Sequence, residues 1–220
     1  MASIPYQLPP TPAPVDLASW PRADHFAFYH EFKEPFFSLV AEVACGSLVR
    51  ACKARGESPT LRLWHAVLRA ANEVEAFRYR IVEDRPVLYP RIHLSPTVAR
   101  PDETFAIIFL PFVDEFDEFQ EVATPLLEAA RLSKGFKLDA GERRIDLIHF
   151  STLPWYRFSA LTHARHMGHT ESEPKITLGR FGERDGELWL PVSVTVHHGL
   201  VDGLHISYFL RRLEELLSAG

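Results

Sequence analysis

One stretch, Val192 to Glu215, constrains the fold of this chain more than any other. It opens with a β-branched apolar run, which is typical of a strand. Two histidines follow, His197 and His198, and then a turn that contains glycines and Asp202. After the turn, apolar residues recur at helical spacing and predict an amphipathic helix: Leu204, Ile206, Phe209, Leu210, Leu213 and Leu217. A strand that ends in a histidine and turns into a helix holds the imidazole on a rigid support.

The pattern His-His-x-x-x-Asp-Gly is more selective than a bare pair of histidines, which on a half-buried strand would be structural. Imidazole is the side chain best matched to proton transfer near neutral pH, so we interpret His198 or His197 as a general base. Asp202 either orients that imidazole or turns toward the core. A buried carboxylate needs a charge partner, and Arg22, which lies among aromatic residues, is the candidate.

Covalent catalysis is not supported by the sequence. It contains no Gly-x-Ser-x-Gly elbow, and neither Cys45 nor Cys52 has the surroundings of a nucleophile. Direct attack by a deprotonated acceptor fits better. The two cysteines are interpreted as small buried hydrophobes in a reducing cytosol.

Composition and charge describe an ordinary globular protein of 220 residues, long enough for a substantial core. The formal net charge of −5 gives no electrostatic footprint for nucleic acid or an anionic membrane. No apolar run reaches transmembrane length, and the N-terminus lacks the pattern of a signal peptide. We therefore expect a cytoplasmic protein that binds neither nucleic acid nor membrane.

The order of expected elements predicts an α/β two-layer sandwich with a large mixed β-sheet and flanking helices. Residues 1–15 are proline-rich and predict an extended arm, and residues 16–220 predict a single domain. Helices are expected around Pro21–Tyr29, with Pro21 in the first helical position, and over Thr60–Val74, Asp117–Ser133 and the segment after Gly203; Pro125 should lie early in its helix or kink it. Strands are expected over Phe36–Val43, Phe77–Val82, Pro86–Tyr89, Thr104–Phe112, Ile145–Thr152, Ile176–Phe181 and Leu188–Val196.

Three further histidines, His163, His166 and His169, are spaced as His-x-x-His-x-x-His, which raises the alternative of a metal site. The segment is not convincingly helical, and no carboxylate or cysteine completes an obvious ligand set, so no metal is expected. The phenylalanines near the N-terminus are interpreted as core or as the lining of an apolar pocket.

Several segments together resemble the chloramphenicol acetyltransferases, a family of trimeric antibiotic-modifying enzymes that use acetyl-CoA. The segments that carry the resemblance are Trp20-x-Arg22-x-x-His25-Phe26-x-x-Tyr29, Glu75–Arg78, Glu103–Phe105, Phe150-Ser151-x-x-Pro154-Trp155, Ile176-Thr177 and Pro191 through His205. The His-x-x-x-Asp-Gly core also occurs in dihydrolipoyl acyltransferases and in peptide-synthetase condensation domains. The former carry lipoyl domains and the latter are about twice this size. The N-terminal and Pro154-Trp155 segments therefore favour the chloramphenicol acetyltransferases over these two families.

The resemblance implies a role for each matching residue. His198 matches the general base that takes the acceptor hydroxyl proton. Asp202 matches a structural residue that is salt-bridged to the arginine matched by Arg22, which replaces the orienting role considered above. Ser151 matches the serine that hydrogen-bonds the oxyanion of the tetrahedral intermediate, and Thr177 matches a threonine that supports it through water.

The resemblance also implies the partners of the site. Arg180 stands where the family has a lysine near the coenzyme, so it is expected to bind an anionic group there. Phe28 and Tyr29 match the aromatic acceptor pocket, to which His163 brings a polar side chain at a position that is apolar in antibiotic-binding members. The family fold further implies a homotrimer, with His198 of one subunit facing the acceptor pocket of the next.

Three functional hypotheses follow. The first is an acetyl-CoA-dependent O-acetyltransferase of the chloramphenicol acetyltransferase type, which would confer antibiotic resistance. The second is an acyltransferase that modifies another hydroxyl or an amine in a biosynthetic pathway. The third is a non-catalytic scaffold, against which the combined presence of the base, the hydroxyls and the salt-bridge pair argues.

Overall fold

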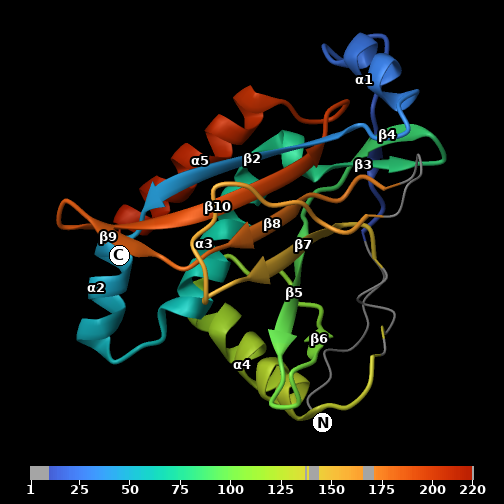
Figure 1. Ribbon diagram of the computed structural model, residues 1–220. Coiled ribbons are helices and arrows are strands. Elements are labelled where there is room, and N and C mark those ends of the chain that lie inside the picture. Colours follow the sequence, from blue (N-terminus) through green and yellow to red (C-terminus); the bar gives the residue numbers. More distant parts are fainter. Residues whose placement is uncertain (1–9, 137, 139–143, 166–170, 220) are drawn as a thin grey trace.

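The computed structural model describes residues 10–136, 138, 144–165 and 171–219. Its helices are α1 (Ala23–His30), α2 (Gly46–Arg55), α3 (Pro59–Glu73), a 3-10 turn η1 (Glu75–Arg78), α4 (Phe116–Leu132) and α5 (Gly203–Ser218). Its strands are β1 (Ala13–Pro14), β2 (Phe36–Ala44), β3 (Tyr79–Val82), β4 (Arg85–Leu88), β5 (His93–Ala99), β6 (Phe105–Ile107), β7 (Leu147–Thr152), β8 (Lys175–Leu178), β9 (Gly182–Arg184) and β10 (Glu187–His197). Figure 1 shows this arrangement.

The larger sheet has the strand order β2-β10-β8-β7-β5-β6, and β9 pairs with the start of β10. Strands β5, β7 and β8 run parallel, whereas β2, β10 and β6 pair antiparallel with their neighbours. A smaller sheet joins β1, β4 and β3. The predicted α/β architecture with a large mixed sheet is confirmed.

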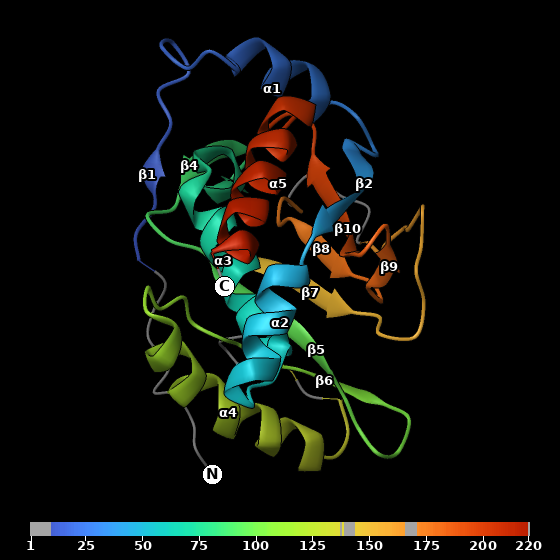
Figure 2. The ribbon, with the colours of Figure 1, turned by 90° about the vertical axis from the view of Figure 1, so that its left-hand side faces the viewer.

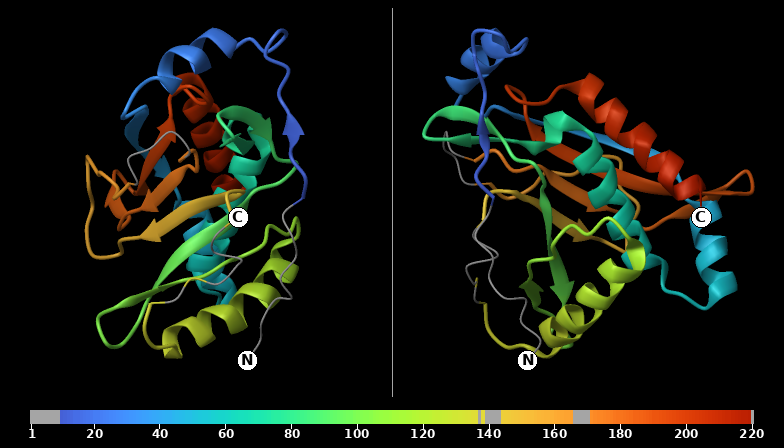
Figure 3. Two further views of the ribbon diagram at one scale, coloured as in Figure 1. Left: turned by 90° about the vertical axis from the view of Figure 1, so that its right-hand side faces the viewer. Right: turned by 180° about the vertical axis from the view of Figure 1, so that it is seen from behind.

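One face of the large sheet is apolar and is covered by helices. On β10 this face carries Val192, Val194 and Val196, each with 0% of its surface exposed. Helices α3 and α5 lie against it (Figures 2 and 3) and contribute Trp64, Val67, Leu68, Ile206, Phe209 and Leu213 to the core. Removing this apolar surface from water supplies the main driving force for folding.

The opposite face of the same sheet is polar, because successive side chains of a strand point to opposite sides. The register places these residues on that face, which we call the polar face: Ser38 of β2, Ser193 and Thr195 of β10, Lys175 and Thr177 of β8, His149 and Ser151 of β7, and Ser95 of β5. Most of these side chains are buried, and a buried polar group is costly unless it is hydrogen-bonded. The arrangement of hydroxyls on this face therefore needs an explanation beyond packing.

The predicted elements are mostly confirmed, with corrections where turns interrupt apolar runs. The strand expected over Thr104–Phe112 is limited to β6, and the start of the one expected at Phe77 is the 3-10 turn η1. Helix α1 starts at Ala23 after Arg22, so Pro21 is not its first residue. Pro125 lies in the interior of α4, not near its start. Helix α2 and strand β5 were not predicted.

Two local predictions concern the arm and the cysteines. The described end of the arm pairs with β4, where Ala13 lies opposite Leu88 and Pro14 opposite Val87. Cys45 and Cys52 are buried and free, as expected for small apolar side chains.

A fully buried guanidinium joins the small sheet to strand β7, which carries Ser151. Arg80 has 0% of its surface exposed and donates to four backbone carbonyls: those of Phe77, Tyr79, Ile145 and Leu147, at 2.6–2.8 Å. Burial lowers its pKa to about 10, so the side chain stays charged at neutral pH. The charge is satisfied by carbonyl dipoles that come from both elements.

Replacing Arg80 with leucine should lower the free energy of unfolding by about 2–4 kcal/mol, because the carbonyls would lose their shared donor inside the protein. Urea unfolding followed by circular dichroism measures this change. The matched control is Arg85→Leu, at an exposed position of the adjacent strand, which should shift stability by no more than about 0.5 kcal/mol. Equal effects of the two variants would contradict the structural role of Arg80.

Candidate active site

The imidazole of His198 lies in the turn after β10 and is held between two aromatic rings. Its centroid is 4.2 Å from that of Tyr29, with the ring planes 15° apart, and 4.5 Å from that of Phe37. Its backbone N–H donates to the carbonyl of Pro35 at 2.8 Å. Ring atom Nδ1 is buried and has no hydrogen-bond partner within the described part of the chain, which leaves Nε2 as the nitrogen that can meet a substrate.

The turn that carries His198 is fixed by Arg22. Its guanidinium donates to Asp202 at 2.5 Å, to the carbonyl of His198 at 2.9 Å and to the carbonyl of Gly199 at 3.4 Å. Asp202 also caps α5 by accepting from the backbone of Leu204 at 3.0 Å. The aspartate therefore faces the arginine and the helix start, which is the second of the two orientations that the sequence left open.

The neighbouring histidine, His197, is structural. Only 2% of its surface is exposed, and Nδ1 accepts a hydrogen bond from the backbone N–H of Gly199 at 3.1 Å. Burial lowers its pKa to about 4, so the ring stays neutral in the folded protein. A β-carbon at position 199 would lie 3.0 Å from this ring and 3.3 Å from the backbone of Phe26, which explains why the turn favours glycine there.

Ser151 and Thr177 lie side by side on the polar face, because their strands pair in register. The hydroxyl of Ser151 is 3.0 Å from that of Thr97. The hydroxyl of Thr177 is 2.9 Å from Nε2 of His163, whose Nδ1 is 3.0 Å from the hydroxyl of Thr195. His163, which lies in the segment after β7, is thus in hydrogen-bond contact with Thr177, another of the expected site residues.

Within one chain, His198 and the hydroxyl pair are far apart. Thr177 lies opposite Ser193, and His198 lies five positions further along the chain. At about 3.3 Å per strand residue, roughly 16 Å separates that level of the sheet from His198. A single chain therefore brings together the two hydroxyls, but not the hydroxyls and the imidazole.

The expected acceptor-pocket aromatics lie beside His198. Phe28 packs edge-on against Tyr29, with centroids 5.1 Å apart, and is itself 60% exposed. Phe32 lies 5.0 Å from Phe28 and 5.2 Å from Tyr29. These rings extend the aromatic surface from the imidazole toward solvent.

Arg180, expected to face the coenzyme, is exposed just after β8. Its backbone N–H donates to the carbonyl of Tyr156 at 2.8 Å. Tyr156 is 71% exposed and the adjacent Trp155 is 61% exposed. Arg180 is thus joined through its backbone to a segment with two exposed aromatic rings, and an exposed guanidinium is suited to bind an anionic group.

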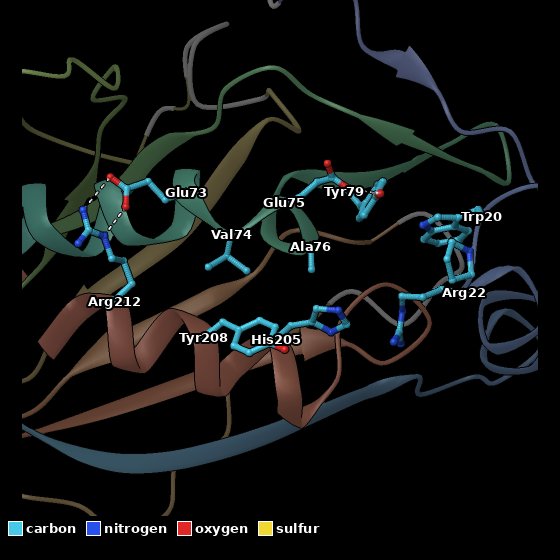
Figure 4. Close-up of a pocket in the computed structure, with 11 residues that line it drawn as sticks. Trp20, Arg22, Glu73, Val74, Glu75, Ala76, Tyr79, His205, Tyr208 and Arg212 are labelled. Atoms are coloured by element: carbon cyan, nitrogen blue, oxygen red, sulfur yellow. Dashed lines mark hydrogen bonds and ion pairs between the residues drawn. The ribbon is translucent and has the colours of Figure 1, made fainter. Parts of the chain in front are cut away.

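A pocket of about 700 Å³ lies on the helical side, between α5, α3 and the start of α1 (Figure 4). It borders Arg22 and His205, and Figure 4 shows Trp20, Tyr79 and Tyr208 on its walls. His198, Ser151 and Thr177 are absent from its lining. This pocket lies behind the Arg22 support rather than at the imidazole.

Two features are absent from the described residues. They contain no cluster of three or more histidine, cysteine or acidic side chains placed to hold a metal ion. His166 and His169, considered as metal ligands with His163, lie outside the described residues. In the described part of the chain, no helix has the length and apolar character needed to cross a membrane.

The family model for chloramphenicol acetyltransferase matches residues 12–214. The chain belongs to the chloramphenicol acetyltransferase family. It is 34% identical to a chloramphenicol acetyltransferase of Streptomyces acrimycini, over 95% of this chain and 96% of the relative, and 26% identical to chloramphenicol acetyltransferase 3 of Escherichia coli, over 93% and 96%. A solved chloramphenicol acetyltransferase structure superposes with a TM-score of 0.84 at 31% identity, covering 94% of this chain and all of that one. The protein is therefore an acyltransferase, and acetyl-CoA is the co-substrate of its family.

Three residues that contact expected site residues are not indicated by any sequence pattern. Phe37 clamps His198, Thr97 contacts Ser151, and Thr195 contacts His163. Each lies on a strand, where the alternation of side chains predicts the face of the sheet on which a residue lies but not which residue it contacts. The partner on the neighbouring strand depends on register, which the sequence does not specify.

Exchanging Asp202 for asparagine should lower the free energy of unfolding by about 1–3 kcal/mol at neutral pH, because the charge-assisted bond to Arg22 is lost. Burial raises the pKa of Asp202, but the hydrogen bond from Arg22 and the nearby positive charges outweigh it, so the pKa lies below its ordinary value of 3.8. The stabilisation is thus present above that value and is lost as pH falls through the lowered pKa.

Unfolding measured from about pH 5 down to about pH 3 should therefore show a steeper loss for the wild type than for Asp202→Asn. Asp114→Asn is the control, since its partner Arg91 is 3.0 Å away and both side chains are mostly exposed. Parallel pH profiles for wild type and Asp202→Asn would contradict the coupling to Arg22.

Proposed function

We propose that the protein is an acetyl-CoA-dependent O-acetyltransferase that acts on chloramphenicol or a closely similar hydroxyl acceptor. The observation that carries the proposal is the aromatic-clamped His198 on a turn that Arg22 and Asp202 fix. A fixed imidazole with one accessible nitrogen is the geometry that a general base requires. Family membership supports the acetyl donor and the acceptor class.

In the proposed reaction, Nε2 of His198 takes the proton of the acceptor hydroxyl as its oxygen attacks the thioester carbonyl of acetyl-CoA. A tetrahedral intermediate forms, and its negative oxygen is stabilised by the hydroxyl of Ser151 and, through water, by Thr177. Collapse breaks the carbon–sulfur bond, and the protonated imidazole returns the proton to the leaving thiolate. The products are CoA and an acetyl ester.

The catalytic groups belong to a shared site in this proposal. His198 and Ser151 are about 16 Å apart along the sheet of one chain, by the strand rise used above. A homotrimer in which His198 of one subunit faces Ser151 and Thr177 of the next brings the base and the donors together. The exposed ring of Phe28 and the partly buried ring of Tyr29 then border the acceptor, with His163 on its polar side, and Arg180 binds an anionic group of the coenzyme.

An acyltransferase for another hydroxyl or an amine is the alternative, and one observation favours it. His163 and the hydroxyls bonded to it make one wall of the site polar. An acceptor with more polar groups than chloramphenicol would satisfy such a wall. A non-catalytic scaffold of the same fold would not need the supported imidazole.

His198→Ala should abolish turnover, because the neighbouring His197 is almost fully buried and cannot replace the imidazole. Ser151→Ala should lower kcat by about 10²–10³, the cost of one oxyanion donor. CoA release, followed with a thiol reagent, measures both, and circular dichroism checks that each variant folds. Ser47→Ala, on the surface helix α2, is the matched control and should keep full activity. Near-normal turnover of folded His198→Ala would overturn the assignment.

The acceptor is tested by comparing CoA release from acetyl-CoA with and without chloramphenicol. Acceptor-dependent release is the expected result. Binding of acetyl-CoA by calorimetry without such release would transfer the assignment to the alternative acceptor, which a panel of hydroxyl and amine compounds would then identify. Neither release nor binding would favour the scaffold.

A further inference from the structure

A continuous row of hydrogen-bonded side chains crosses the polar face from β2 to β8. The hydroxyls of Ser38 and Thr195 are 2.7 Å apart, Thr195 is 3.0 Å from Nδ1 of His163, and Nε2 of His163 is 2.9 Å from the hydroxyl of Thr177. The row ends at the threonine that the proposed mechanism uses. Its other members have no role in that mechanism.

All hydrogen bonds in the row can run in one direction only if the His163 ring is neutral, because a protonated ring donates at both nitrogens. Burial lowers the pKa of His163, and the charge of Lys175 lowers it further, so the ring is neutral near pH 7. A neutral imidazole has one N–H donor and one bare nitrogen acceptor. One of the two threonines therefore receives a hydrogen from the ring, and the other gives one to it.

The tautomer of His163 decides what Thr177 can do. If Nε2 carries the hydrogen, it donates to the Thr177 oxygen, and the Thr177 hydroxyl hydrogen is free to point toward the reaction centre. If Nδ1 carries the hydrogen, the Thr177 hydroxyl must donate its own hydrogen to Nε2. Only the first tautomer leaves Thr177 as a donor.

Either tautomer can give an aligned row, because each hydroxyl can donate or accept, and the donor role of Thr177 selects the first tautomer, in which the contacts run as follows. Bare Nδ1 accepts from the hydroxyl of Thr195, and the Thr195 oxygen accepts from the hydroxyl of Ser38. All hydrogens then point the same way, from β2 toward β8, and aligned hydrogen bonds strengthen one another in a dry interior. Thr177 and Thr195 are 1% and 3% exposed, so water competes little for these groups.

We propose that His163 is a positioning residue that holds the Thr177 hydroxyl as a donor to the water that stabilises the tetrahedral intermediate, through the aligned row Ser38–Thr195–His163–Thr177. The proposal rests on the proposed acetyl transfer. It assigns His163 a part in the reaction through Thr177, in addition to bordering the acceptor.

Steady-state kinetics test this dependence. His163→Leu should lower kcat about tenfold, the value of one neutral hydrogen bond, with KM for acetyl-CoA changed less than about twofold. Thr177→Ala should have a similar effect, and the double variant should be no slower than Thr177→Ala alone, because both changes remove the same donor. His163→Gln, whose amide can replace the Nε2–H, should recover most of the loss. Losses that multiply in the double variant would overturn the proposal.

Ser193→Ala is the matched control. Ser193 lies opposite Thr177 on the same face and is fully buried, and its hydroxyl has no hydrogen-bond partner in the described residues. This variant should keep the wild-type kcat. A purely structural role for His163 would lower the melting temperature while leaving the effect of Thr177→Ala undiminished.

A spectroscopic measurement keeps the test separate from activity. In protein labelled with ¹⁵N-histidine, the His163 ring signals, assigned by their loss in His163→Leu, should show a protonated Nε2 and a bare Nδ1. A protonated Nδ1 would overturn the proposal even in an active enzyme. Should the wild type release no CoA with any acceptor, the proposed function fails, while the tautomer still decides whether the row is aligned as inferred.

Discussion

The contact of Arg22 with the turn after β10 is the interaction on which the rest of the site depends. One guanidinium binds the Asp202 carboxylate and two backbone carbonyls, so it fixes the turn, the start of α5 and the position of His198 at once. Without it, one oxygen of the partly buried Asp202 carboxylate and two backbone carbonyls would lose the donor that Arg22 gives them. The imidazole itself is oriented by packing against aromatic rings, in contrast to enzymes where a carboxylate bonds the ring. Stability and geometry of the site therefore have a common origin.

The two faces of the large sheet have different roles, because side chains alternate between them along each strand. Its apolar face packs under α3 and α5 and supplies the core, whereas its polar face presents hydroxyls and histidines. Strand β10 serves both, since its valines face the helices while Ser193 and Thr195 face the other way. A shift of one residue in its register would bury the hydroxyls under the helices. The arrangement of hydroxyls on the polar face is thus maintained by the same alternation that forms the core.

The sequence was informative where chemistry and local geometry coincide. The strand, turn and helix around His198 follow from periodicity and glycines, and the Arg22 partner of Asp202 follows from the need to pair a buried charge. The choice between His197 and His198 came from resemblance, and the structure gives its physical reason, because His197 is buried and bonded to Gly199. The extents of β6 and η1 were missed because a continuous apolar run does not mark where a turn interrupts it. The position of His163 between two threonines could not be predicted, since it depends on how a long segment returns across the sheet.

The distance along the sheet between His198 and Ser151 has a genetic consequence. If sites form between subunits as proposed, no single chain contains a complete site. Each subunit contributes His198 to the site at one interface and Ser151 and Thr177 to the site at another. A copy damaged at the imidazole and a copy damaged at the serine would each still carry what the other lacks. In a mixed oligomer, some subunit interfaces would combine an intact His198 with an intact Ser151. Two defective alleles of such a protein can then complement within one assembly, and natural selection acts on the pair of neighbours rather than on the single chain.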